Sequence, residues 1–379
     1  MAVERLLPTT EARELIQLTR DIADKVLTPI VDEHERAETY PDGVFATLGE
    51  AGLLSLPYPV EWGGGGQPYE VYLQVLEEIA ARWAAIAVAV SVHSLACHPL
   101  LAFGTEEQRR RWLPEMLGGN TIGAYSLSEP QAGSDAAAVA CKAGPVDGGY
   151  LVNGTKAWIT HGGIADFYNL FARTGEGSRG ISCFLVPRET TGLTFGKPEQ
   201  KMGLHAVPTT TAHYDDGFLP VERRIGTEGQ GLQIALSALD SGRLGIAAVA
   251  TGLAQAALDE AVAYAKERTA FGKPIIDHQG LGFLLADMAA AVDSARATYL
   301  DAARRRDAGL AYSRQASVAK LIATDAAMKV TTDAVQVFGG YGYTRDFRVE
   351  RYMREAKITQ IFEGTNQIQR LVIARSLAQ

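Results

Sequence analysis

Cysteine is scarce in this sequence, and the few cysteines present form no recognisable set. Only Cys97, Cys141 and Cys183 occur among 379 residues, far apart and without a CxxC pair. An odd number of widely spaced cysteines supplies neither a disulfide framework nor a zinc site. We therefore expect reduced, buried thiols in a cytoplasmic protein.

Positive charge and long apolar runs are lacking as well. The chain has 36 lysines and arginines against 44 acidic residues, a formal net charge of -8 and a pI near 5.5. Nucleic acids and anionic membranes are bound by a clustered positive field, so the sequence predicts neither partner. The longest apolar run, residues 84–92, is too short to span a bilayer. The N-terminus carries charges from Glu4 onward, unlike a secretory signal.

The usual signatures of hydrolases and metalloenzymes are missing too. None of the seven histidines belongs to an HExxH pair, so no metal site is predicted, and no GxSxG sequence marks a serine nucleophile. A GxGxxG match occurs at Gly175, Gly177 and Gly180. Dinucleotide binding by that motif requires a helix to follow, whereas ISCFLV at 181–186 is typical of a strand. We interpret the match as a hairpin loop.

The sequence does contain three regions of different texture. Apolar residues follow helical spacing first, then short β-rich runs alternate with Gly and Asn turns, and finally long helical periodicity returns. The expected fold class is α+β, mostly α. Its predicted parts are an N-terminal helical domain over 1–120, a central β-barrel-like domain over 121–228 and a C-terminal four-helix bundle over 229–379. The last bundle is predicted from helical segments at 246–268, 281–306, 315–338 and 349–377.

One acidic residue near the C-terminus stands out by its neighbours. Glu363 follows Ile361 and Phe362 and precedes Gly364 in the segment IFEGTNQIQR. A poorly hydrated carboxylate has a raised pKa and is a stronger base once ionised, and a glycine lets a ligand approach the backbone. The local sequence also allows a simpler interpretation, an acidic residue at the N-terminus of a helix.

Eight segments in register give the chain a resemblance to a known family. They are EWGGGG (61–66), FGTEEQRRRWLP (103–114), YSLSEPQAGSD (125–135), NGTKAWIT (153–160), DSGRLGIAA (240–248), ERTAFGKPI (267–275), QVFGGYGY (336–343) and IFEGTNQIQR (361–370). With these segments the sequence resembles the acyl-CoA dehydrogenases over essentially its whole length. The resemblance implies the same three-domain order, FAD bound between the β domain and the C-terminal helices, and a homotetramer.

The resemblance also implies roles for particular residues. Gln336, Gly339 and Gly340 would reach the cofactor from a neighbouring subunit, and Trp158 would pack against the flavin ring. The residues assigned to FAD are Tyr125, Leu127, Ser128, Ser134, Trp158, Ile159, Thr160, Arg268, Phe271, Gln279, Gln336, Gly339, Gly340, Thr365 and Gln367. Those assigned to the acyl-CoA are Ser134, Asp240, Arg243 and Gly364.

The implied chemistry is α,β-dehydrogenation of an acyl-CoA thioester. Glu363 would remove the α-proton while its backbone N–H helps to hold the enolate oxygen, and Arg243 would organise the site. A hydride from the β-carbon would pass to FAD, giving a trans-2-enoyl thioester, and the electrons would go on to an electron-transfer flavoprotein. Some relatives place the base just before the arginine of the DSGR segment, and that position is Gly242 here.

The resemblance favours a short or medium saturated acyl group, because short-chain relatives are the most similar. Glutaryl-type enzymes hold a distal carboxylate with an arginine on an early helix, where this chain has Ala87. His205 and Pro208 depart from the family pattern in KMGLHAVP (201–208), which puts local substrate or interdomain contacts in doubt. The alternatives are an acyl-CoA oxidase, an enoyl-CoA reductase, a flavin monooxygenase of this fold and a non-catalytic helical interaction protein.

Overall fold

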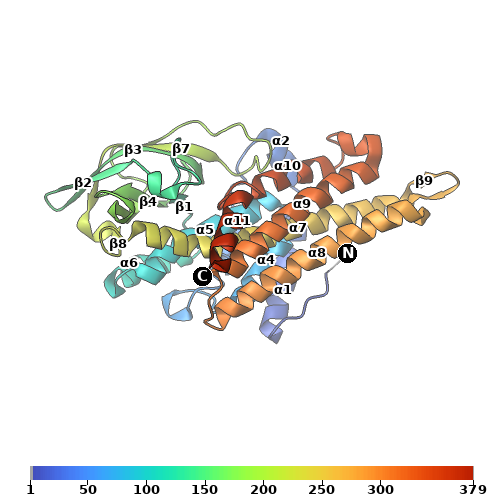
Figure 1. Ribbon diagram of the computed structural model, residues 1–379, viewed down its shortest axis with the longest axis horizontal. Helices are drawn as coiled ribbons and strands as arrows, with labels where there is room; N and C mark the ends of the chain where they lie inside the picture. The colour runs from blue at the N-terminus through green and yellow to red at the C-terminus, as the bar shows by residue number, and fades with distance from the viewer. Residues whose placement is uncertain (1–2, 379) are drawn as a thin grey trace.

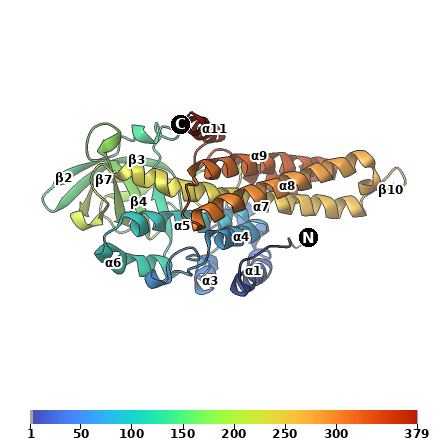
Figure 2. The same ribbon diagram turned by 60° about the horizontal axis from the view of Figure 1, so that its bottom comes forward.

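A helical body and a sheet domain lie end to end in the computed structural model, which describes residues 3–378 (Figure 1). The sheet domain occupies one end, and three long helices run from it toward the other (Figure 2). The N-terminal helices are α1 (Thr10–Ile22), α2 (Val31–Ala37), α3 (Val44–Glu50), α4 (Tyr69–Ala80), α5 (Ala84–Phe103) and α6 (Glu106–Leu117). The C-terminal helices are α7 (Gly231–Glu267), α8 (Gln279–Asp307), α9 (Ser313–Phe338), α10 (Val349–Thr359) and α11 (Asn366–Leu377).

The central region forms one twisted sheet. Its strands are β1 (Gly123–Ser126), β2 (Lys142–Val146), β3 (Gly149–Thr160), β4 (Phe167–Arg173), β5 (Ile181–Pro187), β6 (Leu193–Phe195), β7 (Thr209–Pro220) and β8 (Arg224–Ile225). They follow the order β6-β7-β3-β2-β4-β5-β8, with β1 parallel to β4. The two end strands of this order do not pair within the described residues, so the sheet is open and "barrel-like" was too strong a description. The GxGxxG match lies in the turn between β4 and β5, which confirms the hairpin.

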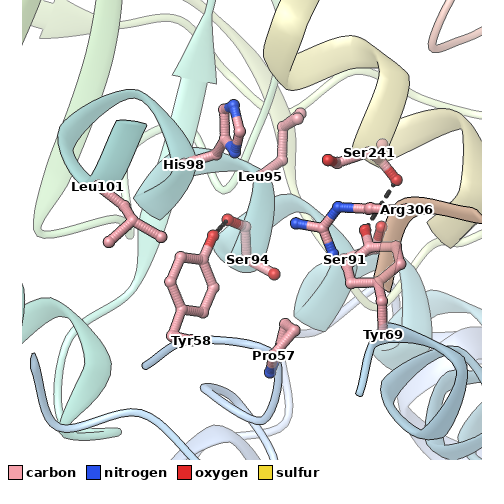
Figure 3. Close-up of a pocket in the computed structure, with 11 residues that line it drawn as sticks. Pro57, Tyr58, Tyr69, Ser91, Ser94, Leu95, His98, Leu101, Ser241 and Arg306 are labelled. Carbon is pink, nitrogen blue, oxygen red and sulfur yellow. Dashed lines mark hydrogen bonds between the residues drawn. The ribbon is translucent and has the colours of Figure 1, made fainter. Parts of the chain in front are cut away.

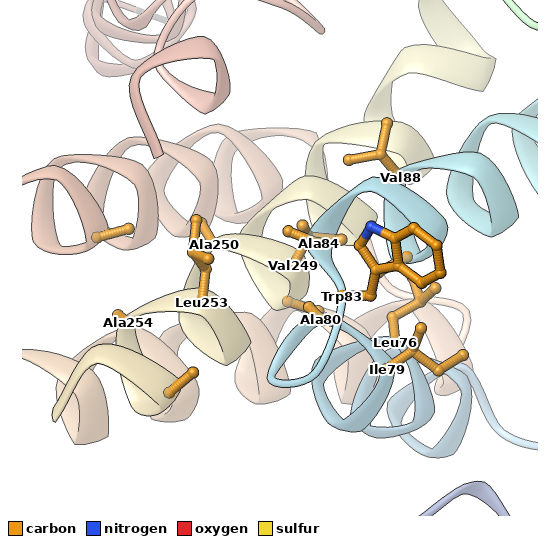
Figure 4. Packing of buried hydrophobic residues seen from close by; sticks show 14 of the residues in the cluster. Leu76, Ile79, Ala80, Trp83, Ala84, Val88, Val249, Ala250, Leu253 and Ala254 are labelled. Atoms are coloured by element: carbon orange, nitrogen blue, oxygen red, sulfur yellow. The ribbon is translucent and has the colours of Figure 1, made fainter. Parts of the chain in front are cut away.

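The core is built around α7, which packs against α4, α5, α8 and α9. Two glycines of α7 allow this close packing, because a Cβ at Gly245 would collide with Ser91 and one at Gly252 with the backbone of Glu77. Trp83 fills the region where α4, α5 and α7 meet, together with Val249 (Figure 4). Apolar burial between these helices supplies most of the driving force for their assembly.

Two expectations about helix length were wrong. The apolar run at 84–92 continues to Phe103 in α5, and both α5 and α7 are long and apolar enough to cross a membrane. Most of each helix is buried inside the protein, however, so their apolar character reflects the core. The segment 349–377 is not one helix, because α10 ends at Thr359 and α11 begins at Asn366. The six residues between them contain Glu363.

Candidate active site

Glu363 lies in the turn between α10 and α11. Its φ of 53° is left-handed, and Gly364 follows with a φ of 85°. A left-handed glutamate is strained, which favours a role for its position rather than a simple helix end. The N-cap of α11 is Thr365, whose hydroxyl accepts from the backbone N–H of Ile368. Glu363 therefore lies two residues before the N-cap of α11, outside the first turn of that helix.

The carboxyl group of Glu363 is poorly solvated. Its Oε2 atom is buried and has no hydrogen-bond partner among the described residues. Burial raises the pKa of Glu363 to about 7, although the charges of Arg243 and Lys320 act in the opposite direction. Gly242 on α7 leaves the space that the carboxyl group occupies, because a Cβ there would lie 2.8 Å from Oε2.

Arg243 is held on α7 beside this carboxyl group. It is buried, and its Nη1 donates to Oδ1 of Asp240 at 2.6 Å. Ser313 donates to the same oxygen at 3.0 Å. Burial raises the pKa of Asp240 despite the opposing charge of Arg243. The Arg243–Asp240 ion pair thus holds the Arg243 cation next to Glu363, while the Asp240 carboxylate does not contact Glu363 directly.

Lys320 is a site residue that the sequence reasoning missed. Its side chain, on α9, is fully buried and donates to the carbonyl oxygen of Gly364 and to Oδ1 of Asn366, both at 2.9 Å. Burial lowers the pKa of Lys320 to about 7, and the nearby Glu363 carboxylate acts in the opposite direction. The sequence did hold a signal, a lone lysine among small and apolar residues in ASVAKLIA (316–323).

The β domain contributes an aromatic wall. Trp158 sits at an irregularity of β3 with a φ of 63°, which leaves its ring 64% exposed. The adjoining loop is anchored by buried Lys156, which donates to the carbonyl oxygen of Leu127 at 2.9 Å and to Glu129 at 2.7 Å. The carbonyl oxygen of Ser128 accepts from the backbone N–H at position 157, so this loop is fixed beside Trp158.

The other residues that the sequence assigned to this wall differ in which groups they leave accessible to a ligand. The Tyr125 hydroxyl donates to the carbonyl oxygen of Ala235 at 3.3 Å. Burial raises the pKa of Tyr125, and the nearby Glu363 carboxylate acts in the same direction. Ile159 points into the sheet core, so only its backbone can meet a ligand. Ser134 is exposed in the loop after β1, Thr160 is half-buried at the end of β3, and Gln367 is exposed in the first turn of α11.

The remaining assigned residues gather at the opposite end of the long helices. Arg268, Gly339 and Gly340 line one groove of about 520 Å³. Phe271, which is 96% exposed, projects from the hairpin of β9 (Thr269–Ala270) and β10 (Lys273–Pro274) beside it. Gln279 begins α8 and Gln336 lies in the last turn of α9, both exposed. Figure 1 shows this hairpin at the far end from the sheet, so one chain does not bring the two groups together.

The departures at His205 and Pro208 make different contacts, one between domains and one within the sheet domain. The backbone N–H of His205 donates to Glu35 at 2.9 Å, and Glu35 also accepts from the indole of Trp83 at 2.8 Å. The carbonyl oxygen of Pro208 accepts from His161 at 2.9 Å. The His205 contact joins the sheet domain to α2, whereas the Pro208 contact ties the end of β3 to the start of β7.

Family models match almost the whole chain. They describe the N-terminal, middle and C-terminal domains of acyl-CoA dehydrogenases and match residues 9–120, 124–217 and 229–378. The chain belongs to the acyl-CoA dehydrogenase family. It is 43% identical to a short-chain specific acyl-CoA dehydrogenase of Clostridium acetobutylicum, with 96% of this chain and 97% of the relative covered.

Solved structures of this family give the same fold. Butyryl-CoA dehydrogenase from Megasphaera elsdenii superposes with a TM-score of 0.97 at 39% identity, covering 99% of this chain and 100% of the other. A chain in the structure of the electron transferring flavoprotein of Acidaminococcus fermentans also gives 0.97, at 41% identity and the same coverage.

Acyl-CoA dehydrogenases depend on FAD, and the residues present are suited to it. The exposed ring of Trp158 offers a flat surface to an isoalloxazine. Arg268 is exposed and makes no ion pair with any carboxylate of residues 3–378, so its guanidinium is available to a phosphate. No atom lies within 4 Å of a Cβ built on Gly339 or Gly340, which leaves their backbone open to a ligand.

Proposed function

We propose that this protein catalyses the FAD-dependent α,β-dehydrogenation of a short or medium acyl-CoA to the trans-2-enoyl-CoA, with Glu363 as the base. The observation that carries the proposal is the Glu363 carboxyl group, which is buried, lacks a hydrogen-bond partner among the described residues and has its pKa raised to about 7. A base with this pKa is suited to proton transfer near neutral pH. The short-chain name of the Clostridium relative supports the chain length.

Two groups of the turn act together in the proposed step. The ionised carboxylate takes the α-proton, and the backbone N–H of Glu363 stabilises the charge that develops on the thioester oxygen. That N–H makes no hydrogen bond to residues 3–378 and is therefore available. FAD, when bound, accepts the β-hydrogen as a hydride.

Neighbouring side chains maintain this arrangement. Arg243 and Lys320 favour the ionised form of Glu363, and Lys320 also holds the turn through the carbonyl oxygen of Gly364. Asp240 and the exposed Ser134 are the further contacts that we propose for the acyl-CoA. Thr365 lies directly beyond the turn, where we propose that it contacts the cofactor.

The separation of the two FAD-binding groups supports an assembly of several copies. Trp158 belongs to β3 and Arg268 directly precedes β9, and Figure 1 shows these two strands in opposite halves of one chain. We propose that a neighbouring subunit supplies Arg268, Gln336 and Gly339 to the flavin that lies against Trp158, within a homotetramer. The electron acceptor in this proposal is an electron-transfer flavoprotein, and the protein acts in the cytoplasm.

Replacement of Glu363 by Gln tests the assignment, because it removes the base and keeps the size of the side chain. The purified FAD-loaded variant is mixed anaerobically with butyryl-CoA, and bleaching of the flavin is followed by stopped flow. We expect FAD content to stay near the wild-type level while the bleaching rate falls by about 10²-fold or more. Wild-type bleaching by the variant would rule out Glu363 as the base.

A further inference from the structure

A small polar cavity lies next to the Glu363 carboxyl group. Its wall includes Ser91, Ser94 and Leu95 of α5 and Ser241 of α7 (Figure 3). Gly242 also lines it, and the position of a Cβ on Gly242 would be 2.8 Å from Oε2 of Glu363 and 3.3 Å from Cδ1 of Leu95. The free space is about 20 Å³, enough for one water molecule. Gly242 therefore borders both the cavity and the space that holds the Glu363 carboxyl group.

An arginine supplies the only charge that we find on the wall of this cavity among the described residues. Arg306, in the last turn of α8, reaches in among Ser91, Ser94 and Ser241 (Figure 3). Its guanidinium carbon lies 3.6 Å from the ring centroid of Tyr69. A guanidinium stays protonated at every relevant pH, so the cavity carries a permanent positive charge.

No carboxylate neutralises Arg306 within residues 3–378. Other arginines of the interior are paired, as Arg20 is with Glu78 at 2.6 Å and Arg296 with Glu77 at 2.9 Å. The carboxylate of the adjacent Asp307 is engaged by the backbone N–H groups of Tyr69 and residue 70. A partly buried cation without a counter-charge is unfavourable, and an anionic ligand would relieve that cost.

The Tyr312 hydroxyl hydrogen-bonds Arg306 and the Tyr69 ring lies against it, but neither group carries a negative charge. Tyr69 donates its hydroxyl to the carbonyl oxygen of Ser241 at 3.0 Å, and Tyr58 donates to that of Ser94. Burial and the charge of Arg306 lower the pKa of His98 to about 4, so its ring is neutral at pH 7. The cavity thus offers hydroxyl groups and one guanidinium, an environment that is unfavourable for a methyl terminus and favourable for an oxygen acceptor.

We propose that this cavity receives the distal end of the acyl chain, and that Arg306 selects a short acyl-CoA whose chain ends in a carboxylate. The inference rests on the proposed dehydrogenation at Glu363 and narrows its substrate class. Because the free space holds only one water, side chains of the cavity wall must move to admit a carboxylate. The position on α5 where glutaryl-type enzymes carry an arginine is occupied here by the buried Ala87. In this protein the cation comes from Arg306 on α8 instead.

The test compares thioesters of matched length on the FAD-loaded enzyme. Butyryl-CoA and hexanoyl-CoA are measured against glutaryl-CoA and adipyl-CoA by anaerobic flavin bleaching, with wild type, Arg306→Met and Arg306→Lys. We expect wild type to prefer the carboxylate-bearing compounds about 10-fold or more in kcat/KM. Arg306→Met should lose about 10- to 100-fold on glutaryl-CoA and adipyl-CoA, mainly through KM, because a charged hydrogen bond to the carboxylate is lost. Its change on butyryl-CoA, which has no carboxylate to bind, should be much smaller.

The control is Arg304→Met on the same helix, because Arg304 is half-exposed and pairs with Glu70 at 2.8 Å outside the cavity. If Arg306→Met changes all four thioesters alike, or if wild type gains nothing from the terminal carboxylate, the inference is wrong while dehydrogenation of butyryl-CoA still stands. If no thioester bleaches the flavin, both proposals are wrong. Arg306→Lys keeps the charge and serves as the second variant should Arg306→Met not fold.

Discussion

Replacing Gly242 by Ala should slow the reaction without destabilising the fold. A Cβ at this position would lie 2.8 Å from Oε2 of Glu363, whereas ordinary contacts begin near 3.4 Å. The carboxyl group must therefore retreat by about half an ångström, which is easy for the end of a side chain. A misplacement on the order of 1 Å can reduce a rate about 10²-fold, so we expect flavin bleaching by butyryl-CoA to fall by about 10- to 100-fold.

The fold should not suffer from the same change. Gly242 lies inside α7, where alanine is favoured over glycine by up to about 1 kcal/mol. Cδ1 of Leu95, 3.3 Å from the new Cβ, needs only a slight adjustment. The melting temperature should therefore stay level or rise while bleaching slows. Gly282→Ala in α8 is the matched control, because its Cβ would meet only an ordinary contact at 3.8 Å. Wild-type bleaching by Gly242→Ala would show that the carboxyl group does not act from this place.

Three further predictions follow from the charges around Glu363. Burial raises the pKa of Glu363 to about 7, and only the ionised form is a base. We therefore expect kcat/KM, which reports groups of the free enzyme, to rise with pH and to be half-maximal near pH 7. A flat profile from pH 5 to 9 would contradict this. Lys320→Met removes a charge that favours ionisation of Glu363, so the half-maximal pH should increase. The free energy of unfolding in urea should fall by only about 1–2 kcal/mol, because Gly364 and Asn366 each keep another hydrogen-bond donor. A double variant, Gly242→Glu with Glu363→Gly, places an acid on the opposite side of the same space, and it should bleach faster than Glu363→Gly alone.

The outline of the fold was predictable because it depends on local periodicity. The helical segments and the β-rich middle region were recognised from apolar spacing and turn residues, and the hairpin at Gly175–Gly180 from the strand that follows it. The break between α10 and α11 was missed, because residues 360–365 contain no proline and only one glycine. A left-handed Glu363 is stabilised by contacts that are distant in sequence, such as the Lys320 bond to Gly364.

The environment of the carboxyl group shows where local reasoning reaches its limit. The sequence attributed poor hydration of Glu363 to Ile361 and Phe362, but Ile361 is 48% exposed. The burial comes instead from α7 and α9, which bring Gly242 and Lys320 to the turn from about 120 and 40 residues away. The direction of the pKa shift was correctly expected, and the residues that cause it could be named only from the structure.

Three consecutive residues of α7 connect the proposed base with the proposed specificity cavity. Ser241 lines the cavity that contains Arg306, Gly242 makes room for the Glu363 carboxyl group, and Arg243 carries the charge that favours its ionisation. Because one rigid helix carries all three, a shift of α7 would move the base and the cavity wall together. The distance from the α-carbon to the recognised end of the acyl chain is therefore set by a single element, and substrate length should be altered more readily by changes on α5, at Leu95, than by changes on α7.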